Sequence, residues 1–191
     1  MKKPYFVDRK FGNLRPADIP TQPGDYENCI FSACDFSGSD LSGFVFIECT
    51  FQDCNLSLAK LINTSFRETS FINSKLLGLH FDDCNNMVIS FDFENCHIEL
   101  SSFNKLKISR TSFKNSVIAE VDFTATDLSY SSFADCDLQR SVFHDTNLEG
   151  ADFRTAFNYS IDPLTNRIKK AKFSLRGIAG LLGRYDIVID D

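Results

Sequence analysis

The sequence predicts an all-β solenoid in which the chain winds through square coils of about twenty residues. Three observations predict this fold. A large apolar residue recurs at every fifth position from Tyr26 to Phe153, a small residue usually stands two positions before it, and residue types repeat again after twenty positions.

The apolar series comprises 26 units, 12 before a two-residue slip and 14 after it, and it uses 14 of the 20 phenylalanines. Before the slip the central residues are Tyr26, Phe31, Phe36, Leu41, Phe46, Phe51, Leu56, Leu61, Phe66, Phe71, Leu76 and Phe81. After the slip they are Val88, Phe93, Ile98, Phe103, Ile108, Phe113, Ile118, Phe123, Leu128, Phe133, Leu138, Phe143, Leu148 and Phe153.

A period of five excludes the two common regular structures. Five residues of an α-helix turn the chain by about 500°, so the central residues would scatter around every side. On a straight strand an odd step places successive side chains on opposite faces. A chain that turns a corner in each unit points every central residue inward, and four right-angle corners close a square.

The twenty-residue period predicts columns of like side chains on successive coils, about 4.8 Å apart. One column is Phe31, Phe51, Phe71, Phe93, Phe113, Phe133 and Phe153, and the opposite one is Leu41, Leu61, Phe81, Phe103, Phe123 and Phe143. The other two columns become aliphatic after the slip. We expect about six and a half coils, roughly 31 Å long, with capped ends.

The chain divides by pattern into three segments. Residues 1–24 contain four prolines and "GNLRPADIP", and we expect them to form an irregular N-terminal cap. The repeats occupy residues 25–161. Residues 162–191 form a C-terminal cap, in which "SLRGIAGLLGRY" predicts a short helix with Ser174 as its N-cap and "YDIVID" predicts a strand.

Charge and composition indicate which kinds of partner the protein could bind and in which compartment it resides. The net charge is −6: residues 1–24 carry +3, residues 25–161 carry −11 and residues 162–191 carry +2. An acidic solenoid argues against direct binding to nucleic acid. The sequence has no apolar run long enough to cross a membrane and no apolar region typical of a signal peptide, so we expect a cytoplasmic protein.

The stretch "CDFSGSDLSG" at residues 34–43, with a small residue, Asp or Asn and then Leu or Phe, resembles the pentapeptide-repeat family. The resemblance covers Tyr26 to Phe153 and implies a right-handed quadrilateral β-helix, in agreement with the square coil. More narrowly, "CDFSGSDLSGFVFIECTF" and "LLGRYDIVI" resemble the quinolone-resistance (Qnr) proteins and their relatives MfpA and McbG.

This narrower resemblance implies a homodimer that acts on DNA gyrase or topoisomerase IV. The cap and dimerisation residues that it implies are Leu175, Ile178, Leu181, Leu182, Tyr185, Ile187 and Ile189. Qnr proteins also carry loops inserted into the β-helix. Here the only insertion is a two-residue bulge at Asp83, Cys84, Asn85, Asn86 and Met87. The chain therefore resembles the loopless MfpA more closely.

Two readings of the repeat carboxylates remain open. In one, Asp before each central residue only stabilises turns and keeps the protein soluble. In the other, a stiff acidic rod mimics DNA on a topoisomerase and modulates the enzyme or protects it from quinolone-like or peptide poisons. The acidic face would comprise Asp25, Asp35, Asp40, Asp122, Asp127, Asp137 and Asp152. The alternative function is a structural scaffold with another protein partner.

The sequence offers no catalytic constellation. His80, His97 and His144 flank central residues and have no Ser or Cys nucleophile held beside them. "HFDDC" with "CH" at Cys96 and His97 is a poor zinc site, because Cys96 should point into the core. Cys29 and Cys49 should stack on adjacent coils, but a reducing cytosol disfavours a disulfide. We expect no enzyme activity, cofactor or metal.

Overall fold

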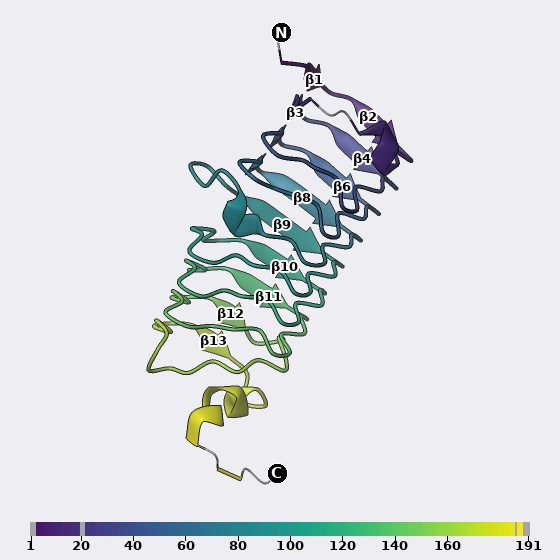
Figure 1. Ribbon diagram of the computed structural model, residues 1–191. Coiled ribbons are helices and arrows are strands. Elements are labelled where there is room, and N and C mark those ends of the chain that lie inside the picture. Colours follow the sequence, from purple (N-terminus) through teal and green to yellow (C-terminus); the bar gives the residue numbers. More distant parts are fainter. Residues whose placement is uncertain (1–2, 20–21, 186, 189–191) are drawn as a thin grey trace.

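The computed structural model describes residues 3–19, 22–185 and 187–188, and it shows a rod of stacked coils with the termini at opposite ends (Figure 1). The predicted right-handed quadrilateral β-helix is confirmed. All strand pairs are parallel and join successive coils, and the register shift is 20 residues for most pairs.

Two of the four sides of the rod carry named strands. The strands are β1 Tyr5–Val7, β2 Lys10–Gly12, β3 Asp25–Glu27, β4 Ile30–Ser32, β5 Val45–Ile47, β6 Thr50–Gln52, β7 Ser65–Arg67, β8 Thr69–Ile72, β9 Phe91–Glu94, β10 Ser112–Lys114, β11 Ser132–Ala134, β12 Asp152–Phe153 and β13 Lys172–Phe173. One sheet has the order β1-β3-β5-β7, and a nine-stranded sheet runs from β2 to β13 along the whole rod.

We name the sides in chain order. Face A contains β1, β3, β5 and β7 and continues through Lys107, Asp127, Asn147 and Arg167. Face B is the nine-stranded sheet. Face C is the side on which isolated parallel bridges join Asp35 to Asn55 and continue through Lys75 and His97 to Phe157. Face D is the side on which Asp40 bridges to Lys60. After this pair the bridges on face D run from His80 through Asp122 to Val142.

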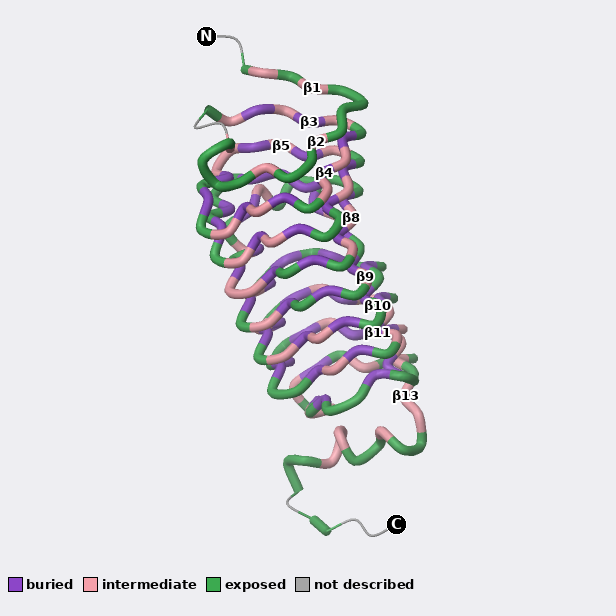
Figure 2. Tube along the Cα trace, turned by 90° about the vertical axis from the view of Figure 1, so that its right-hand side faces the viewer, coloured by how far each residue is buried: buried purple, intermediate pink, exposed green. Residues whose placement is uncertain are grey.

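The core consists of stacked columns, as predicted. On face B the rings of Phe31 and Phe51 stack with centroids 4.8 Å apart, and those of Phe113 and Phe133 are 4.9 Å apart. The column continues beyond the predicted repeat, with Phe11 stacked on Phe31 at one end and Phe173 on Phe153 at the other. Buried residues alternate with intermediate or exposed ones along the coils between Tyr26 and Ile161 (Figure 2).

A left-handed residue at most corners explains why the unit has five residues. The second residue after nearly every buried central side chain has a positive φ, for example Asn28 at 50°, Gly38 at 62° and Glu120 at 56°, and the exceptions follow Phe81 and Phe153. A residue in this conformation turns the chain sharply, and only Gly adopts it without a steric penalty. Asn is enriched at this position because its side chain tolerates the left-handed region.

Most of the Thr, Ser and Cys side chains two positions before a centre donate a hydrogen bond to a backbone carbonyl, whereas Ala59 and Ala151 at this position only fill space. Thr64 Oγ1 donates to the Leu41 carbonyl oxygen at 2.7 Å, and Cys54 Sγ donates to the Phe31 carbonyl at 3.4 Å. Each bond reaches back 23 residues to the preceding coil. The side chains therefore tie successive coils together inside the core, where an unpaired polar group would be costly.

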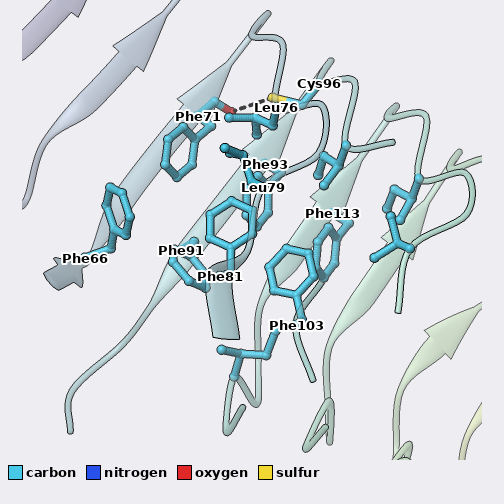
Figure 3. Close-up of a cluster of buried hydrophobic side chains, with 14 of the residues drawn as sticks. Phe66, Phe71, Leu76, Leu79, Phe81, Phe91, Phe93, Cys96, Phe103 and Phe113 are labelled. Carbon is cyan, nitrogen blue, oxygen red and sulfur yellow. Dashed lines mark hydrogen bonds between the residues drawn. The ribbon is translucent and has the colours of Figure 1, made fainter. Parts of the chain in front are cut away.

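The slip is a bulge on face A between the 3-10 helix η2 (Phe81–Asp83) and β9, where the register shift rises to 22 residues. The prediction that Val88 is a central residue was wrong, because Val88 is 55% exposed. Phe91 is instead buried, with its ring 5.2 Å from Phe81 and 5.9 Å from Phe66 (Figure 3). The extra residues carry Val88 outward and bring Phe91 into the gap.

The N-terminal segment is more regular than the irregular cap that we predicted. β1 pairs with β3 and β2 with β4, so residues 5–12 form two sides of a further coil. The chain then leaves the repeat through the 3-10 helix η1, Pro16–Asp18. In this turn the Pro16 carbonyl oxygen accepts a hydrogen bond from Ile19 N–H. Ser39 Oγ, one coil further on, has no hydrogen-bond partner among the described residues. A cavity of about 110 Å³ lined by Phe6 and other core residues lies at this end.

The C-terminal segment has tighter turns than the predicted helix. Ser174 Oγ accepts from Gly177 N at 3.1 Å as an N-cap would, but the turns that follow are the 3-10 helices η3 Ile178–Leu181 and η4 Gly183–Tyr185. Of the predicted strand, Ile187 and Val188 are described and neither belongs to one. Ile189 lies outside the described residues. No helix in the described part of the chain is long and apolar enough to cross a membrane.

Candidate partner-binding surface

The seven predicted carboxylates do not form one acidic face. Asp25 and Asp127 lie on face A but five coils apart, Asp152 lies on face B, and the remaining four divide equally between faces C and D. Those four are Asp35 and Asp137 on face C and Asp40 and Asp122 on face D. The predicted single face is therefore corrected to carboxylates around the whole rod.

Most of these carboxylates stabilise their own corner. The Oδ1 atoms of Asp35 and Asp40 accept from the backbone N–H of Ser37 and Ser42, both at 3.0 Å. The same bond, to the residue two positions on, occurs at three further corners and at β12. Its acceptors there are Asp122, Asp127, Asp137 and Asp152. The turn-forming role of the aspartates is therefore present at six of the seven positions.

At two corners the turn bond also favours the charged form of the carboxylate. Hydrogen bonds from Ser37 lower the pKa of Asp35 below its usual value, and those from Ser42 do the same for Asp40. A hydrogen-bonded charged form is favoured over the neutral one. Asp35 and Asp40 therefore keep their negative charges at fixed places on the rod.

Two of the seven carboxylates are already paired with cations. Lys3 Nζ lies 2.5 Å from Asp25 Oδ1. Arg154 binds Asp152 with two nitrogens, at 2.9 and 2.7 Å, and this contact lowers the pKa of Asp152. Lys172 lies 3.7 Å from the same carboxylate. These two positions present less free charge to a partner than the other five.

The predicted bulge presents an apolar tip. Met87 is 85% exposed, and its N–H donates to Asn85 Oδ1 at 3.2 Å. Asp83 and Asn86 are exposed, whereas Cys84 is buried under the loop. Burial raises the pKa of the Cys84 thiol. The bulge is therefore a short loop that protrudes from face A and carries an exposed apolar side chain.

The C-terminal cap has an inner glycine side and an outer apolar side. A Cβ on Gly180 would lie 2.5 Å from the Tyr159 carbonyl oxygen, and one on Gly177 would lie 2.2 Å from the Tyr159 hydroxyl. Leu181 packs partly against the core, and Leu182 is half-buried. The remaining described members of the predicted set are exposed: Leu175, Ile178, Tyr185 and Ile187, together with their neighbour Val188.

Sequence reasoning missed the role of these glycines. Only the apolar residues of this segment were assigned to the predicted cap and dimerisation set, whereas Gly177 and Gly180 allow close approach to Tyr159. The two glycines are three residues apart, which places them on the side of the turns opposite the leucines. This spacing is the sequence signal that could have identified the glycines as the inner side of the cap. Leu175 and Ile178 consequently point away from the rod.

Metal and thiol chemistry receive no support from the side-chain arrangement. Among residues 3–19, 22–185 and 187–188, no three His, Cys, Asp or Glu side chains are grouped as a metal site would require. All seven cysteines are buried free thiols. Burial raises the pKa of Cys49 and Cys54 to about 12, so these thiols stay protonated.

Comparison with solved structures identifies proteins of the same fold over the whole chain. Full-length QnrB1, a plasmid-mediated fluoroquinolone resistance protein, matches with a TM-score of 0.64 and 18% identity, covering 96% of this chain and 100% of QnrB1. A trypsin-treated QnrB1 variant matches with a TM-score of 0.63 and 19% identity, covering 100% of both chains. No curated protein sequence matches this chain.

Family models match both halves of the rod. The pentapeptide-repeat models cover residues 29–67 and 51–85, and the model of a pentapeptide repeat region covers residues 90–157. The gap between the two matched halves coincides with the bulge. The left-handed corners, the stacked columns and these matches agree: the chain belongs to the pentapeptide-repeat family.

Proposed function

We propose that the protein is a non-catalytic acidic rod that binds a type II topoisomerase, either DNA gyrase or topoisomerase IV, as a mimic of DNA. In doing so it modulates the enzyme or protects it from quinolone-like or peptide poisons. The observation that carries the proposal is the placement of fixed carboxylates on all four sides of a straight rod. The QnrB1-like fold along the full chain is consistent with it.

The charge density of the rod sets the expected strength of this mimicry. Residues 25–161 have a net charge of −11 and span about seven coils. At about 4.8 Å per coil this is about one net negative charge per 3 Å, against about one per 1.7 Å in duplex DNA. Long-range attraction to a DNA-binding surface is therefore expected, but it should be weaker than that of DNA and sensitive to salt.

The test removes charge without removing the turns. Asn55 and Asn147 stand at the same position of the repeat and accept the same turn bond, at 3.1 and 3.3 Å. Asn can therefore replace Asp with little loss of stability. We would change five aspartates to Asn, namely Asp35, Asp40, Asp122, Asp127 and Asp137.

The readout is supercoiling by purified gyrase and decatenation by topoisomerase IV, each with and without a quinolone. Wild-type protein should inhibit or protect, and the five-fold Asn variant should lose most of this effect. A variant carrying Asn55→Asp and Asn147→Asp is the matched control and should act at least as strongly. An unchanged effect of the five-fold variant contradicts DNA mimicry, and no binding by the wild type favours the scaffold function.

We also propose that two copies associate through their C-terminal caps. The support is the outer apolar side of the cap, where Leu175 is 89% exposed and Val188 is 88% exposed. Apolar side chains gathered at one end favour burial against a partner. Light scattering should give a dimer, and Leu175→Asp with Val188→Asp should weaken it. Leu100→Asp, at an exposed site in the middle of the rod, is the control.

A further inference from the structure

Face A changes sign halfway along the rod. Its N-terminal half, crossed by β1, β3, β5 and β7, carries five carboxylates, and two cations lie among them. The carboxylates are Asp8, Asp25, Glu27, Glu48 and Glu68, and the cations are Lys3 and Arg67. Lys3 is already paired with Asp25, whereas Glu48 and Glu68 are exposed and have no ion pair among the described residues.

The C-terminal half of face A has the opposite composition. By the same repeat positions it carries six cations and three carboxylates on the coils that cross the face at Lys107, Asp127, Asn147 and Arg167, so the net charge is +3 against −3 in the first half. The cations are Lys105, Lys107, Arg110, Arg167, Lys169 and Lys170, and the carboxylates are Asp127, Asp145 and Glu149. Within the described chain only Arg167 among these cations has an ion pair, with Glu149 at 3.3 Å.

The bulge marks the midpoint of this reversal. Face A is crossed by four strands before the bulge and by four coils after it. The bulge therefore occupies the central crossing, and its tip carries the exposed apolar side chains of Met87 and Val88. The net charge on one side of this point is the opposite of that on the other side.

We propose that face A is an interaction surface for a second copy of this chain, in which two rods lie side by side and antiparallel. A two-fold axis through the bulge places the acidic half of each rod against the basic half of its partner. This arrangement is self-complementary, as two-fold interfaces are. It sets Asp8 opposite Lys170 of the partner subunit, and Glu68 opposite Arg110 of the partner subunit.

The position of the axis explains the apolar tip. In this pair the two bulges meet at the axis, where the same residues of both copies face each other. Met87 and Val88 would bury apolar surface at the bulge, which is the boundary between the acidic half and the basic half of face A. A parallel pair would instead set like charges against each other along the whole face, which costs energy.

The pair should be weak and sensitive to salt. Face A is long and narrow, so it belongs with the smaller, transient interfaces rather than with permanent dimers. Its attraction depends on exposed charges, which salt screens beyond a Debye length of about 10 Å at 0.1 M. Association along face A should therefore fall at least about tenfold between about 0.05 M and about 0.5 M salt.

Charge reversal gives a direct test. An acid-reversed variant carries Glu48→Lys and Glu68→Lys, and a base-reversed variant carries Lys107→Glu and Arg110→Glu. All four side chains are exposed, so both variants should fold. Each variant alone should associate at least about tenfold more weakly than the wild type, because both halves of face A now have the same sign. An equimolar mixture of the two should recover association, because the two chains are complementary to each other.

Cross-linking separates this pair from the cap-to-cap dimer. Met87→Cys places a reactive thiol at the proposed axis, while the seven native cysteines are buried. A short bis-maleimide should link two Met87→Cys chains at low salt and not at high salt. In a cap-to-cap dimer these positions are at least about 40 Å apart, because four coils of about 4.8 Å separate each from its own end. Val142→Cys, exposed on face D, is the control and should not cross-link.

The outcomes are distinguishable. Cap-to-cap association involves no residue of face A and should be equal in all the charge variants. Sedimentation that gives the same mass for wild type, each variant and the mixture overturns the face A pair. Failure of Met87→Cys to cross-link at low salt overturns it as well. Neither result bears on topoisomerase binding.

Discussion

The two halves of the rod fill the same square interior in different ways. Before the bulge the aromatic columns lie on neighbouring faces A and B: Phe46 stacks on Phe66, and Phe51 stacks on Phe71. After it they lie on opposite faces B and D, where Phe103 stacks on Phe123 at 5.3 Å. The second aromatic column therefore moves from face A to face D.

Phe91 makes this change possible. Its ring contacts Phe66, the last aromatic centre of face A, and Phe81, the first aromatic centre of face D. It also lies 6.1 Å from the ring of Phe103 on the next coil. The bulge is thus a junction between two packing patterns as well as a loop on the surface.

Face A also differs in backbone structure on the two sides of the bulge. Before the bulge the residue ahead of each centre is Tyr5, Asp25, Val45 or Ser65, and the chain forms strands. After the bulge Asp127 and Asn147 bond to the backbone two residues on, and no strand forms on this face in the described chain. The turn bond alone does not decide the difference, because Asp152 makes the same bond within β12.

The largest effect should follow from weakening the junction. Phe91→Ala removes a side chain that is only 3% exposed, and we expect a loss of about 3–5 kcal/mol in the free energy of unfolding. Because each coil of a solenoid contacts only its neighbours, the two halves should also unfold in separate steps. Urea denaturation followed by circular dichroism measures both effects. Val88→Ala is the control, and a single unshifted transition for Phe91→Ala would contradict the junction.

A smaller loss should follow from crowding the C-terminal cap. A methyl group on Gly180 meets the Tyr159 carbonyl oxygen, so Gly180→Ala should cost about 1–3 kcal/mol. Gly38→Ala in the first half meets no atom within 4 Å but retains φ at +62°, so it should cost about 1–2 kcal/mol. Thermal unfolding compares them. Only the Gly180→Ala variant should change the mass measured by light scattering. If the mass of this variant is unchanged, the C-terminal cap does not mediate dimerisation.

Removing the side-chain acceptor at one corner should have a still smaller effect. Asp127→Ala removes the acceptor for Ser129 N–H and for Asn147 Nδ2, and we expect a loss of about 0.5–1.5 kcal/mol. Asp127→Asn keeps an acceptor, as Asn147 does one coil further on, and should lose less than half of that. Equal losses for Ala and Asn in urea denaturation would show that the charge, rather than the turn bond, stabilises the corner.

The smallest effect should be the loss of stability in acid. Hydrogen bonds lower the pKa of Asp35 and Asp40 in the first half, and Arg154 lowers that of Asp152 in the second. A carboxyl whose pKa is lower in the folded state binds protons more readily when unfolded. Its contribution is therefore present above about pH 4 and is lost as the pH falls through the folded value.

Unfolding free energies measured between pH 7 and pH 3 should show this decline. Asp152→Asn should remove its own share of the decline, as should Asp35→Asn combined with Asp40→Asn. A decline that is identical in the wild type and in all these variants would show that other carboxylates cause the acid sensitivity.

The period of five and the period of twenty determined the square coil and its columns from the sequence alone. These features depend on local repetition: each centre must be buried and each corner turned, whichever coil contains it. Even the face B column was predictable residue by residue, because its register depends only on the spacing of like side chains. The same local logic predicted a turn-forming role for Asp35 and Asp127.

Only the tertiary structure decided what happens where the repetition fails. Val88 continues the spacing but is exposed, because the volume left between Phe66 and Phe81 is filled by the larger Phe91. Gly177 and Gly180 adjoin Tyr159 through contacts that no periodicity encodes. The distribution of charge over four sides, and its reversal along face A, depends on which coil and which face each residue reaches.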